Sequence, residues 1–207
     1  LVLVSTEQGL REMIQEIKST CVGKELAVDL EHHEHRTYRG FVCLVQISTR
    51  QKDFIVDPFD IFEHMHLLNE VFSDPSIVKV LHGADRDVIW LQRDFSVYVV
   101  NMFDTGQATR QLRLQGGFSL ANLVHHFCGV KLDKKYQTAD WRERPLPSDY
   151  VHYARCDTHY LLYCYDRLKN ALLTRASASS VGVMHNADEL PVTAEGIQSL
   201  QSVLDKS

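Results

Sequence analysis

The stretch Ala27-Val-Asp-Leu-Glu31 places two carboxylates two positions apart at the end of an apolar, strand-like segment. Alternate residues of a strand point to the same face of a sheet, so Asp29 and Glu31 project together and could share a metal ion. An Asp-x-Glu pair at the end of a strand is more often a solvated sheet edge. Taken alone, the pair is therefore a weak signal, and the surrounding sequence decides its meaning.

The segments on either side of this stretch predict a strand meander preceded by a helix. Three extended runs rich in Val and Ile, at residues 25–31, 41–49 and 53–57, are typical of strands and lie close together in the chain. Residues 1–4 also read as a short strand. The helix that follows them is indicated by capping-box spacing between Ser5 and Gln8, and by an apolar stripe at Leu10, Met13, Ile14 and Ile17.

Beyond residue 57 strands and helices alternate, which indicates an α/β domain. We predict strands over 77–81 and 98–102. Apolar spacing and end signals predict four helices. The first carries Leu67, Leu68, Val71 and Phe72, with Asp60 and Glu63 as candidate caps. The others are predicted over 84–94, over 119–128 with Gly129 as its end, and from Ser148 to about Arg175.

Residues 130–147 lack periodicity, and a loop of this length is usually retained for function. They carry the basic residues Lys131, Lys134, Lys135, Arg142 and Arg144. The stretch Arg175-Ala-Ser-Ala-Ser-Ser180 is rich in small residues and predicts a linker, and the remainder holds at most one short helix. We therefore predict one domain over residues 1–175, followed by a linker and tail over 176–207.

The composition bounds the possible functions. The chain has 207 residues, of which 44% are hydrophobic and 24% charged, as expected of a soluble globular domain. A net charge of −5 argues against gripping nucleic acid through a broad positive surface, so any such contact must be local. The five cysteines include no close Cys-x-x-Cys pair, which favours a reducing compartment. No apolar run approaches the ~18 residues of a membrane helix.

Two further segments carry carboxylates at structured positions. In His82-Gly-Ala-Asp85-Arg-Asp87-Val-Ile-Trp90 a strand runs into a helix, and the two acids could simply be first-turn residues favoured by the helix dipole. Tyr153 and Asp157 are four residues apart in a helix, so their side chains lie on the same side of it. Neither segment is informative alone, but the ordered set of three is uncommon.

This set resembles the three exonuclease motifs of the DEDD superfamily, in its tyrosine-containing DEDDy branch. Further segments make the chain similar to the RNase D group, closest to the exoribonuclease attached to the nuclear RNA exosome. They are His82-Gly-Ala84, Asp140-Trp-Arg142, Arg144-Pro-Leu146, and Tyr153-Ala-Arg with Asp157-Thr-His-Tyr-Leu161. The resemblance covers roughly residues 1–175 and implies an RNase H-like (DnaQ-like) exonuclease fold, with a mixed β-sheet flanked by helices. The tail does not show the helicase-and-RNase-D module that follows in the family.

Site roles follow from the resemblance. Asp29, Glu31, Asp87 and Asp157 are expected to hold two divalent cations, Mg²⁺ or Mn²⁺, with Asp29 between them. Asp87 has the family's spacing, whereas Asp85 is the competing carboxylate. Tyr153 is expected to orient the attacking water as a hydrogen-bond partner, because its ordinary pKa of about 10 keeps it protonated.

Contacts to RNA are also implied by the resemblance. Trp90, Lys134 and Gln137 are expected to meet the terminal nucleotides, although Trp90 could equally be a core residue. Cys156 stands where relatives often carry Ala or Asp, and its thiol need not ligate hard ions. A zinc site at His32, His33 and His35 is disfavoured, because adjacent side chains of an extended chain point in opposite directions.

The resemblance implies a metal-dependent 3′→5′ exoribonuclease that hydrolyses single-stranded RNA from its 3′ end to nucleoside 5′-monophosphates. It also implies a place in the nucleus and nucleolus, with some cytoplasmic pool, and a role in ribosomal RNA processing and RNA decay. The implied partners are the exosome core, a small cofactor bound to an N-terminal region, and an RNA helicase, with no membrane. A catalytically silent RNA-binding scaffold and a DNA proofreading-type exonuclease remain as alternatives.

Overall fold

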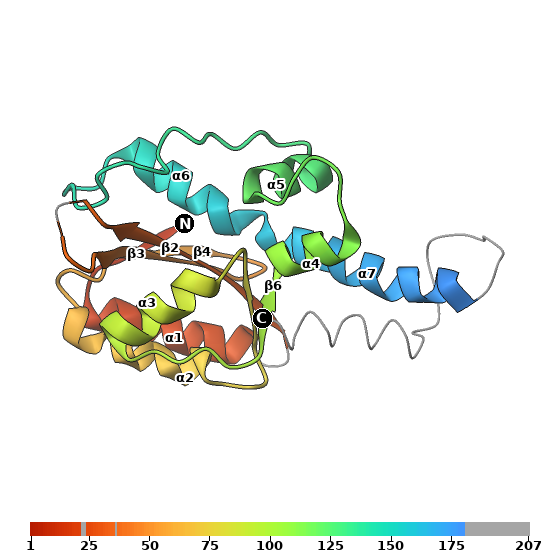
Figure 1. Cartoon of the computed structure of the whole chain (residues 1–207). Helices are drawn as coiled ribbons and strands as arrows, with labels where there is room; N and C mark the ends of the chain where they lie inside the picture. The colour runs from red at the N-terminus through yellow and green to blue at the C-terminus, as the bar shows by residue number, and fades with distance from the viewer. Residues whose placement is uncertain (22–23, 36, 181–207) are drawn as a thin grey trace.

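The computed structural model describes residues 1–21, 24–35 and 37–180, and within them six strands form one mixed sheet with helices on both faces (Figure 1). The strand order is β1-β4-β3-β2-β5-β6. The strands are β1 (Val2–Val4), β2 (Glu25–His33), β3 (Phe41–Ser48), β4 (Asp53–Val56), β5 (Val78–Leu81) and β6 (Met102–Asp104). β2, β3 and β4 form the predicted antiparallel meander, and β1, β5 and β6 pair in parallel with their neighbours.

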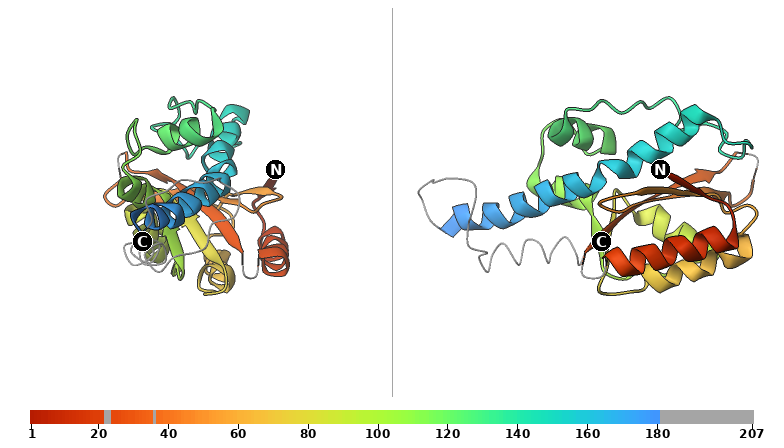
Figure 2. Two further views of the ribbon diagram at one scale, coloured as in Figure 1. Left: turned by 90° about the vertical axis from the view of Figure 1, so that its right-hand side faces the viewer. Right: turned by 180° about the vertical axis from the view of Figure 1, so that it is seen from behind.

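The helices divide into two layers (Figures 1 and 2). One face of the sheet carries α1 (Glu7–Cys21), the 3₁₀ helix η1 (Phe62–Leu68), α2 (Asn69–Phe72) and α3 (Asp85–Phe95). The other carries α4 (Thr105–Leu112), α5 (Leu120–Cys128), α6 (Ser148–His159) and α7 (Leu161–Ser180). The predicted α/β architecture, a mixed sheet flanked by helices, is confirmed.

The central strand β2 distributes its side chains between the two layers. Val28 and Leu30 are buried in the apolar cluster that contains α1, α2 and α3. Ala27 is buried in the opposite cluster with α5 and α7. Asp29 and Glu31 have the same strand parity as Ala27, so they point toward the layer that contains α6. The alternation of one strand therefore separates core residues from carboxylates.

Two helical segments begin differently in the structure from what the sequence predicted. Thr6 rather than Ser5 caps α1, because its hydroxyl accepts a backbone N–H of the first turn at 3.1 Å. The segment expected to begin with Asp60 or Glu63 as a cap is a 3₁₀ helix whose N-cap residue, Ile61, makes no side-chain capping hydrogen bond. Both predicted caps were therefore wrong, although both helical segments are present.

The strand predicted over 98–102 begins only at its last residue. Asn101 adopts a left-handed conformation with φ of 57°, which breaks an extended chain. The amides before it are used elsewhere, since Val100 N donates to the Phe72 carbonyl at 2.9 Å and Tyr98 N donates to the Asn69 side chain. Strand β6 therefore forms after this irregular segment, from Met102 onward.

The long helix predicted from Ser148 is interrupted at Tyr160, whose N–H bonds to the Thr158 carbonyl instead of extending the α-helical ladder. Helix α7 then continues through Ser180, so residues 176–180 are helical and not the linker that their small side chains predicted. None of the helices in the described part of the chain is long and apolar enough to cross a membrane. The expected tail and short helix beyond residue 180 lie outside the described residues.

A largely buried hydrogen-bond network fastens α6 to β3 and β4. The Ser48 hydroxyl lies 2.7 Å from both the Asp53 carboxylate and the Thr158 hydroxyl. Arg155 donates to Asp53 at 2.6 Å, and His159 Nδ1 lies 2.9 Å from the same carboxylate. Burial alone would raise the pKa of Asp53, but the hydrogen bonds from Arg155, Ser48 and His159 outweigh it and lower that pKa. The carboxylate is therefore the ionised centre of the network.

Replacing Asp53 by Ala should lower the free energy of unfolding by about 2–4 kcal/mol at neutral pH, because buried donors would lose their acceptor. Asp53 stabilises the fold as an anion, so the contribution of its charge should be lost as pH falls below about 4 and through the lowered folded pKa, and the difference between wild type and variant should shrink there. Urea denaturation at several pH values measures both effects. The control is Glu70→Ala, which breaks an exposed 2.8 Å ion pair with Lys18 and should cost under about 1 kcal/mol. Equal losses in the two variants would contradict the role of the network.

Candidate active site

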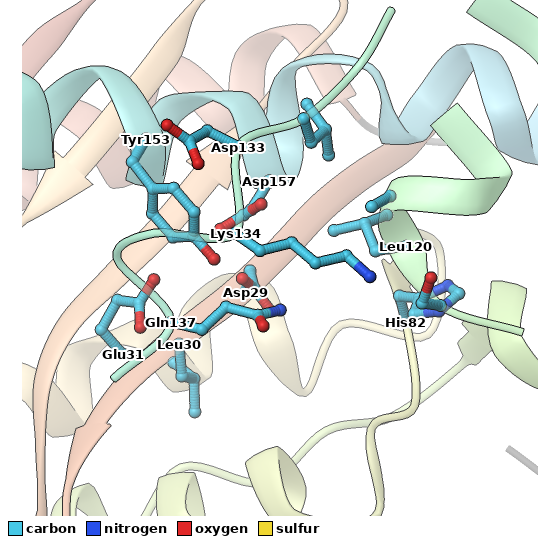
Figure 3. Close-up of a pocket in the computed structure, with 13 residues that line it drawn as sticks. Asp29, Leu30, Glu31, His82, Leu120, Asp133, Lys134, Gln137, Tyr153 and Asp157 are labelled. Carbon is cyan, nitrogen blue, oxygen red and sulfur yellow. The ribbon is translucent and has the colours of Figure 1, made fainter. Parts of the chain in front are cut away.

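Three carboxylates from two elements converge above the central strand. The oxygens of Asp29 and Glu31 on β2 and of Asp157 on α6 lie within 4.8 Å of one another. Figure 3 shows the strand residues and the helix residue turned toward a common space. Glu31 is 8% exposed and Asp157 is 7% exposed, so their negative charges are largely removed from water.

The fourth predicted carboxylate, Asp87, lies in the first turn of α3 and is buried, whereas the competing Asp85 is exposed. Burial raises the pKa of Asp87 to about 8, and the charge of Asp29 adds to this shift. The charge of Asp87 in turn helps to raise the pKa of Glu31. Asp87 therefore interacts electrostatically with the cluster, although it is not in the group of carboxylates whose oxygens lie within 4.8 Å of one another.

Burial and mutual repulsion act together on these acids. The pKa of Asp29 is raised well above its usual value by burial first and by the charge of Asp157 second. Burial raises the pKa of Asp157 to about 7, although a hydrogen bond from Tyr153 works against the shift. Several buried carboxylates that share one space cannot all ionise cheaply. A divalent cation would relieve this repulsion, and an all-oxygen set of ligands suits a hard ion such as Mg²⁺ or Mn²⁺.

Tyr153 closes the cluster from the side of α6. It is 9% exposed and packs near the rings of Trp141 and Tyr136, each at a centroid distance of 5.8 Å. Burial, and then the charge of Asp157, raise the pKa of Tyr153 above its ordinary value. Its hydroxyl therefore stays protonated at neutral pH and can donate a hydrogen bond into the site (Figure 3).

A buried acid that the sequence analysis did not single out holds the turn before α3. The carboxylate of Asp104 accepts hydrogen bonds from Gly83 N at 2.8 Å and Ala84 N at 3.0 Å, and it also caps α4 through Gly106 N at 2.7 Å. A side chain at Gly106 would press on this carboxylate, since a Cβ there would lie 3.0 Å from its oxygen. Asp104 thus fixes the turn that delivers Asp87. The sequence signal was an Asp at a strand-to-helix junction, which is a helix N-cap pattern.

The cluster opens into a cavity of about 330 Å³. Lys134 and Gln137, from the predicted basic loop, line this cavity together with Asp29, Glu31, Tyr153 and Asp157. In Figure 3 the Lys134 side chain extends across the cavity toward His82. Lining residues that the sequence analysis did not propose include His82, Asp133 and the first residues of α5. The cavity therefore joins the carboxylates to a cationic side chain.

Trp90 is placed differently from the other two RNA-binding candidates. It stacks on His32 with a centroid distance of 3.9 Å and an interplanar angle of 2°, packs against the core, and is not among the cavity-lining residues. His33 turns instead toward Phe41, with ring centroids 5.8 Å apart. Among the described residues, the potential metal ligands that bring three or more ligand atoms within 4.8 Å of one another are Asp29, Glu31 and Asp157. This group contains no histidine.

Comparison with known proteins agrees with this geometry. Residues 1–173 match the family model described as a 3′-5′ exonuclease. The chain is 50% identical to the exosome complex exonuclease RRP6 of Saccharomyces cerevisiae over 184 residues, covering 89% of this chain and 24% of that protein. It therefore spans about a quarter of the length of that curated relative.

Solved structures extend the comparison. A mutant of the catalytic core of RRP6 from Trypanosoma brucei matches with a TM-score of 0.84 and 46% identity, over 100% of this chain and 50% of that one. Escherichia coli RNase D, described as an exoribonuclease involved in structured RNA processing, matches with a TM-score of 0.76 and 27% identity, over 85% and 45% of the two chains. The RNase H-like exonuclease fold and the resemblance to RRP6 and RNase D are confirmed, and this chain belongs to the 3′-5′ exonuclease family.

Proposed function

We propose that this chain is the catalytic domain of a metal-dependent 3′→5′ exoribonuclease that hydrolyses single-stranded RNA to nucleoside 5′-monophosphates. The observation that carries the proposal is the convergence of Asp29, Glu31 and Asp157 beside a cavity, in a chain of the 3′-5′ exonuclease family. The similarity to Escherichia coli RNase D, an exoribonuclease, supports RNA as the substrate.

The carboxylates are proposed to bind the metal ions. The charge of Asp29 raises the pKa of Asp87, and the charge of Asp157 raises the pKa of Asp29. We therefore assign Asp29 the central position between Asp87 and Asp157. Glu31 completes the set, and Gln46 Nε2, 3.5 Å from a Glu31 oxygen, helps to orient it. Two bound divalent cations would polarise the scissile phosphate, activate a water molecule and stabilise the leaving 3′ oxygen.

The remaining residues are proposed to orient the reactants. Tyr153, held protonated by burial and by the charge of Asp157, would orient the attacking water without acting as its base. Lys134 would neutralise phosphate charge in the cavity, and Gln137 would hydrogen-bond the terminal nucleotides. Trp90 stays a proposed RNA contact, but His32 covers one face of its ring, so RNA could meet only the rest of it.

We further propose that the domain, residues 1–175, works in exosome-linked RNA processing and decay, including ribosomal RNA maturation. This proposal rests on relatives that are named as exosome components. It places the protein in the nucleus and nucleolus with some cytoplasmic pool, in contact with the exosome core, a small cofactor and an RNA helicase.

RNA labelled at its 5′ end should be shortened in a ladder from its 3′ end when Mg²⁺ or Mn²⁺ is added. A blunt hairpin should resist, because the terminal nucleotides must be splayed out of a duplex to reach the buried carboxylates. Gel electrophoresis beside a circular RNA and a matched single-stranded DNA is the measurement. Cleavage of the circle would refute the exonuclease, binding without cleavage would favour the silent scaffold, and a preference for DNA would favour the proofreading class.

Asp29→Asn and Tyr153→Phe should fail in different ways. The first removes the central negative charge, so Mn²⁺ affinity and cleavage should collapse together. The second leaves every proposed metal ligand in place, so ions and RNA should still bind while single-turnover cleavage falls by roughly 10²-fold or more. Calorimetric Mn²⁺ titration and single-turnover kinetics separate the two defects. If Tyr153→Phe lost metal as severely as Asp29→Asn, or cleaved like wild type, the assignment of Tyr153 would be wrong.

The raised pKa values predict how stability without metal depends on pH. A carboxyl whose folded pKa exceeds its unfolded value stabilises the fold below about pH 4, and this contribution is lost as pH rises through the folded value. For Asp157 and Asp87 the folded values are about 7 and about 8. In EDTA the melting temperature should therefore fall between about pH 5 and 8, and the rise produced by Mn²⁺ should grow over the same range.

Differential scanning fluorimetry of wild type and Asp87→Asn tests this dependence. The amide cannot ionise, so the variant should lose less stability than wild type as pH rises, and it should gain less from Mn²⁺. Parallel pH curves for the two proteins in EDTA would show that Asp87 does not titrate in the cluster.

A further inference from the structure

A second set of metal-ligand side chains lies on α6, beside the carboxylate cluster but outside it. Cys156 Sγ and His152 Nε2 are 3.7 Å apart. The two residues are four positions apart, so their side chains share one side of the helix. His152 is exposed and Cys156 is partly exposed, so both can be reached from solvent. Neither has a role in the hydrolysis proposed above.

These side chains face a cavity of about 390 Å³ that adjoins the carboxylate cavity. Tyr153 and Asp157 line both cavities, so they form part of the wall between them. Asp133 and Asp149 also line the second cavity. A ligand held by His152 and Cys156 would therefore sit against the back of the proposed catalytic residues.

The chemistry of this pair differs from that of the carboxylate cluster. Thiolate and imidazole select zinc over magnesium, whereas a cluster of carboxylate oxygens suits hard ions. With Zn–S near 2.3 Å and Zn–N near 2.0–2.1 Å, a tetrahedral ion separates its sulfur and nitrogen ligands by about 3.6 Å. The observed separation of 3.7 Å requires little movement of either side chain.

We propose that His152 and Cys156 bind Zn²⁺ at a site distinct from the carboxylate cluster. Asp149 is the third proposed ligand: it precedes His152 by three residues on the same side of α6 and is exposed. Among the described residues its carboxylate does not lie within 4.8 Å of both other ligand atoms, so its side chain must turn toward the pair. Its carboxylate is 3.2 Å from the Tyr136 hydroxyl, and it would exchange that hydrogen bond for the ion. Water completes the coordination, which makes the site weaker than a structural zinc centre with four protein ligands.

Zinc at this position inhibits the nuclease, an effect that rests on the function proposed above. Cys156 directly precedes Asp157, and the ion would add a double positive charge behind the wall formed by Tyr153 and Asp157. That charge stabilises the Asp157 carboxylate from behind and weakens its attraction for the proposed catalytic ions. Zinc therefore opposes the Mg²⁺-supported reaction without entering the carboxylate cluster.

Cobalt(II) titration of the whole chain tests the site without using activity. Co²⁺ substitutes for zinc and shows a thiolate-to-metal absorption band when cysteine is a ligand. The band should saturate at one equivalent in wild type and be lost in both Cys156→Ala and His152→Ala. Cys128→Ala, which removes another partly exposed thiol on α5, should retain it. The absence of a band in wild type, its persistence in either α6 variant, or its loss in the Cys128 control would overturn the site.

Zinc titration of Mg²⁺-supported RNA degradation tests the inhibition. Without zinc both α6 variants should degrade RNA at the wild-type rate. The zinc concentration for half-inhibition should rise at least about tenfold, because even the loss of a residue that only supports a ligand costs about 10- to 100-fold in metal affinity. Unchanged inhibition in both variants would place the inhibitory ion in the carboxylate cluster and overturn this part of the proposal. A chain that degraded no RNA would refute the proposed function, while the cobalt spectrum would still decide the metal site.

Discussion

Asp29, Glu31 and Asp157 hold their oxygens within 4.8 Å of one another in a largely buried site, and like charges at such separations repel strongly. Two unit charges about 4 Å apart interact by about 4 kcal/mol at an effective dielectric constant of about 20. Protonation relieves part of this repulsion, as the raised pKa values of Asp87 and Asp157 indicate. The rest of the fold must hold these groups together against it.

Each carboxylate-bearing element is held by contacts that do not depend on metal. Helix α6 is fastened to the sheet by the Asp53 network, and the turn before α3 is fixed by Asp104. Strand β2 is held by pairing with β3 on one side and β5 on the other. The proposed ligands are therefore carried by rigid elements, as a precisely built site requires.

The sequence was informative where one local signal determined the outcome. Alternation along residues 27–31 placed Asp29 and Glu31 on one face, and helical spacing brought Tyr153 and Asp157 together. Prediction from the sequence failed where tertiary contacts determined the local conformation. Asn101 turns left-handed within a run that otherwise favours a strand, and Asp104 spans two loops whose proximity no spacing reveals. Likewise, the stacking of Trp90 on His32 depends on how α3 packs against the end of β2.

The alternation of β2 also bears on how this sequence can drift over evolutionary time. Its core-facing residues Val28 and Leu30 support folding, whereas its charged positions oppose folding in the absence of metal. Neutral replacements at Asp29 or Glu31 would leave the apolar layer intact and remove a repulsion. Selection for stability alone would therefore push these positions toward uncharged residues within an unchanged fold. Under the proposed function, one or two such substitutions would abolish catalysis within the same fold. The carboxylates, which cost stability without metal, are therefore explained by the proposed chemistry and not by folding.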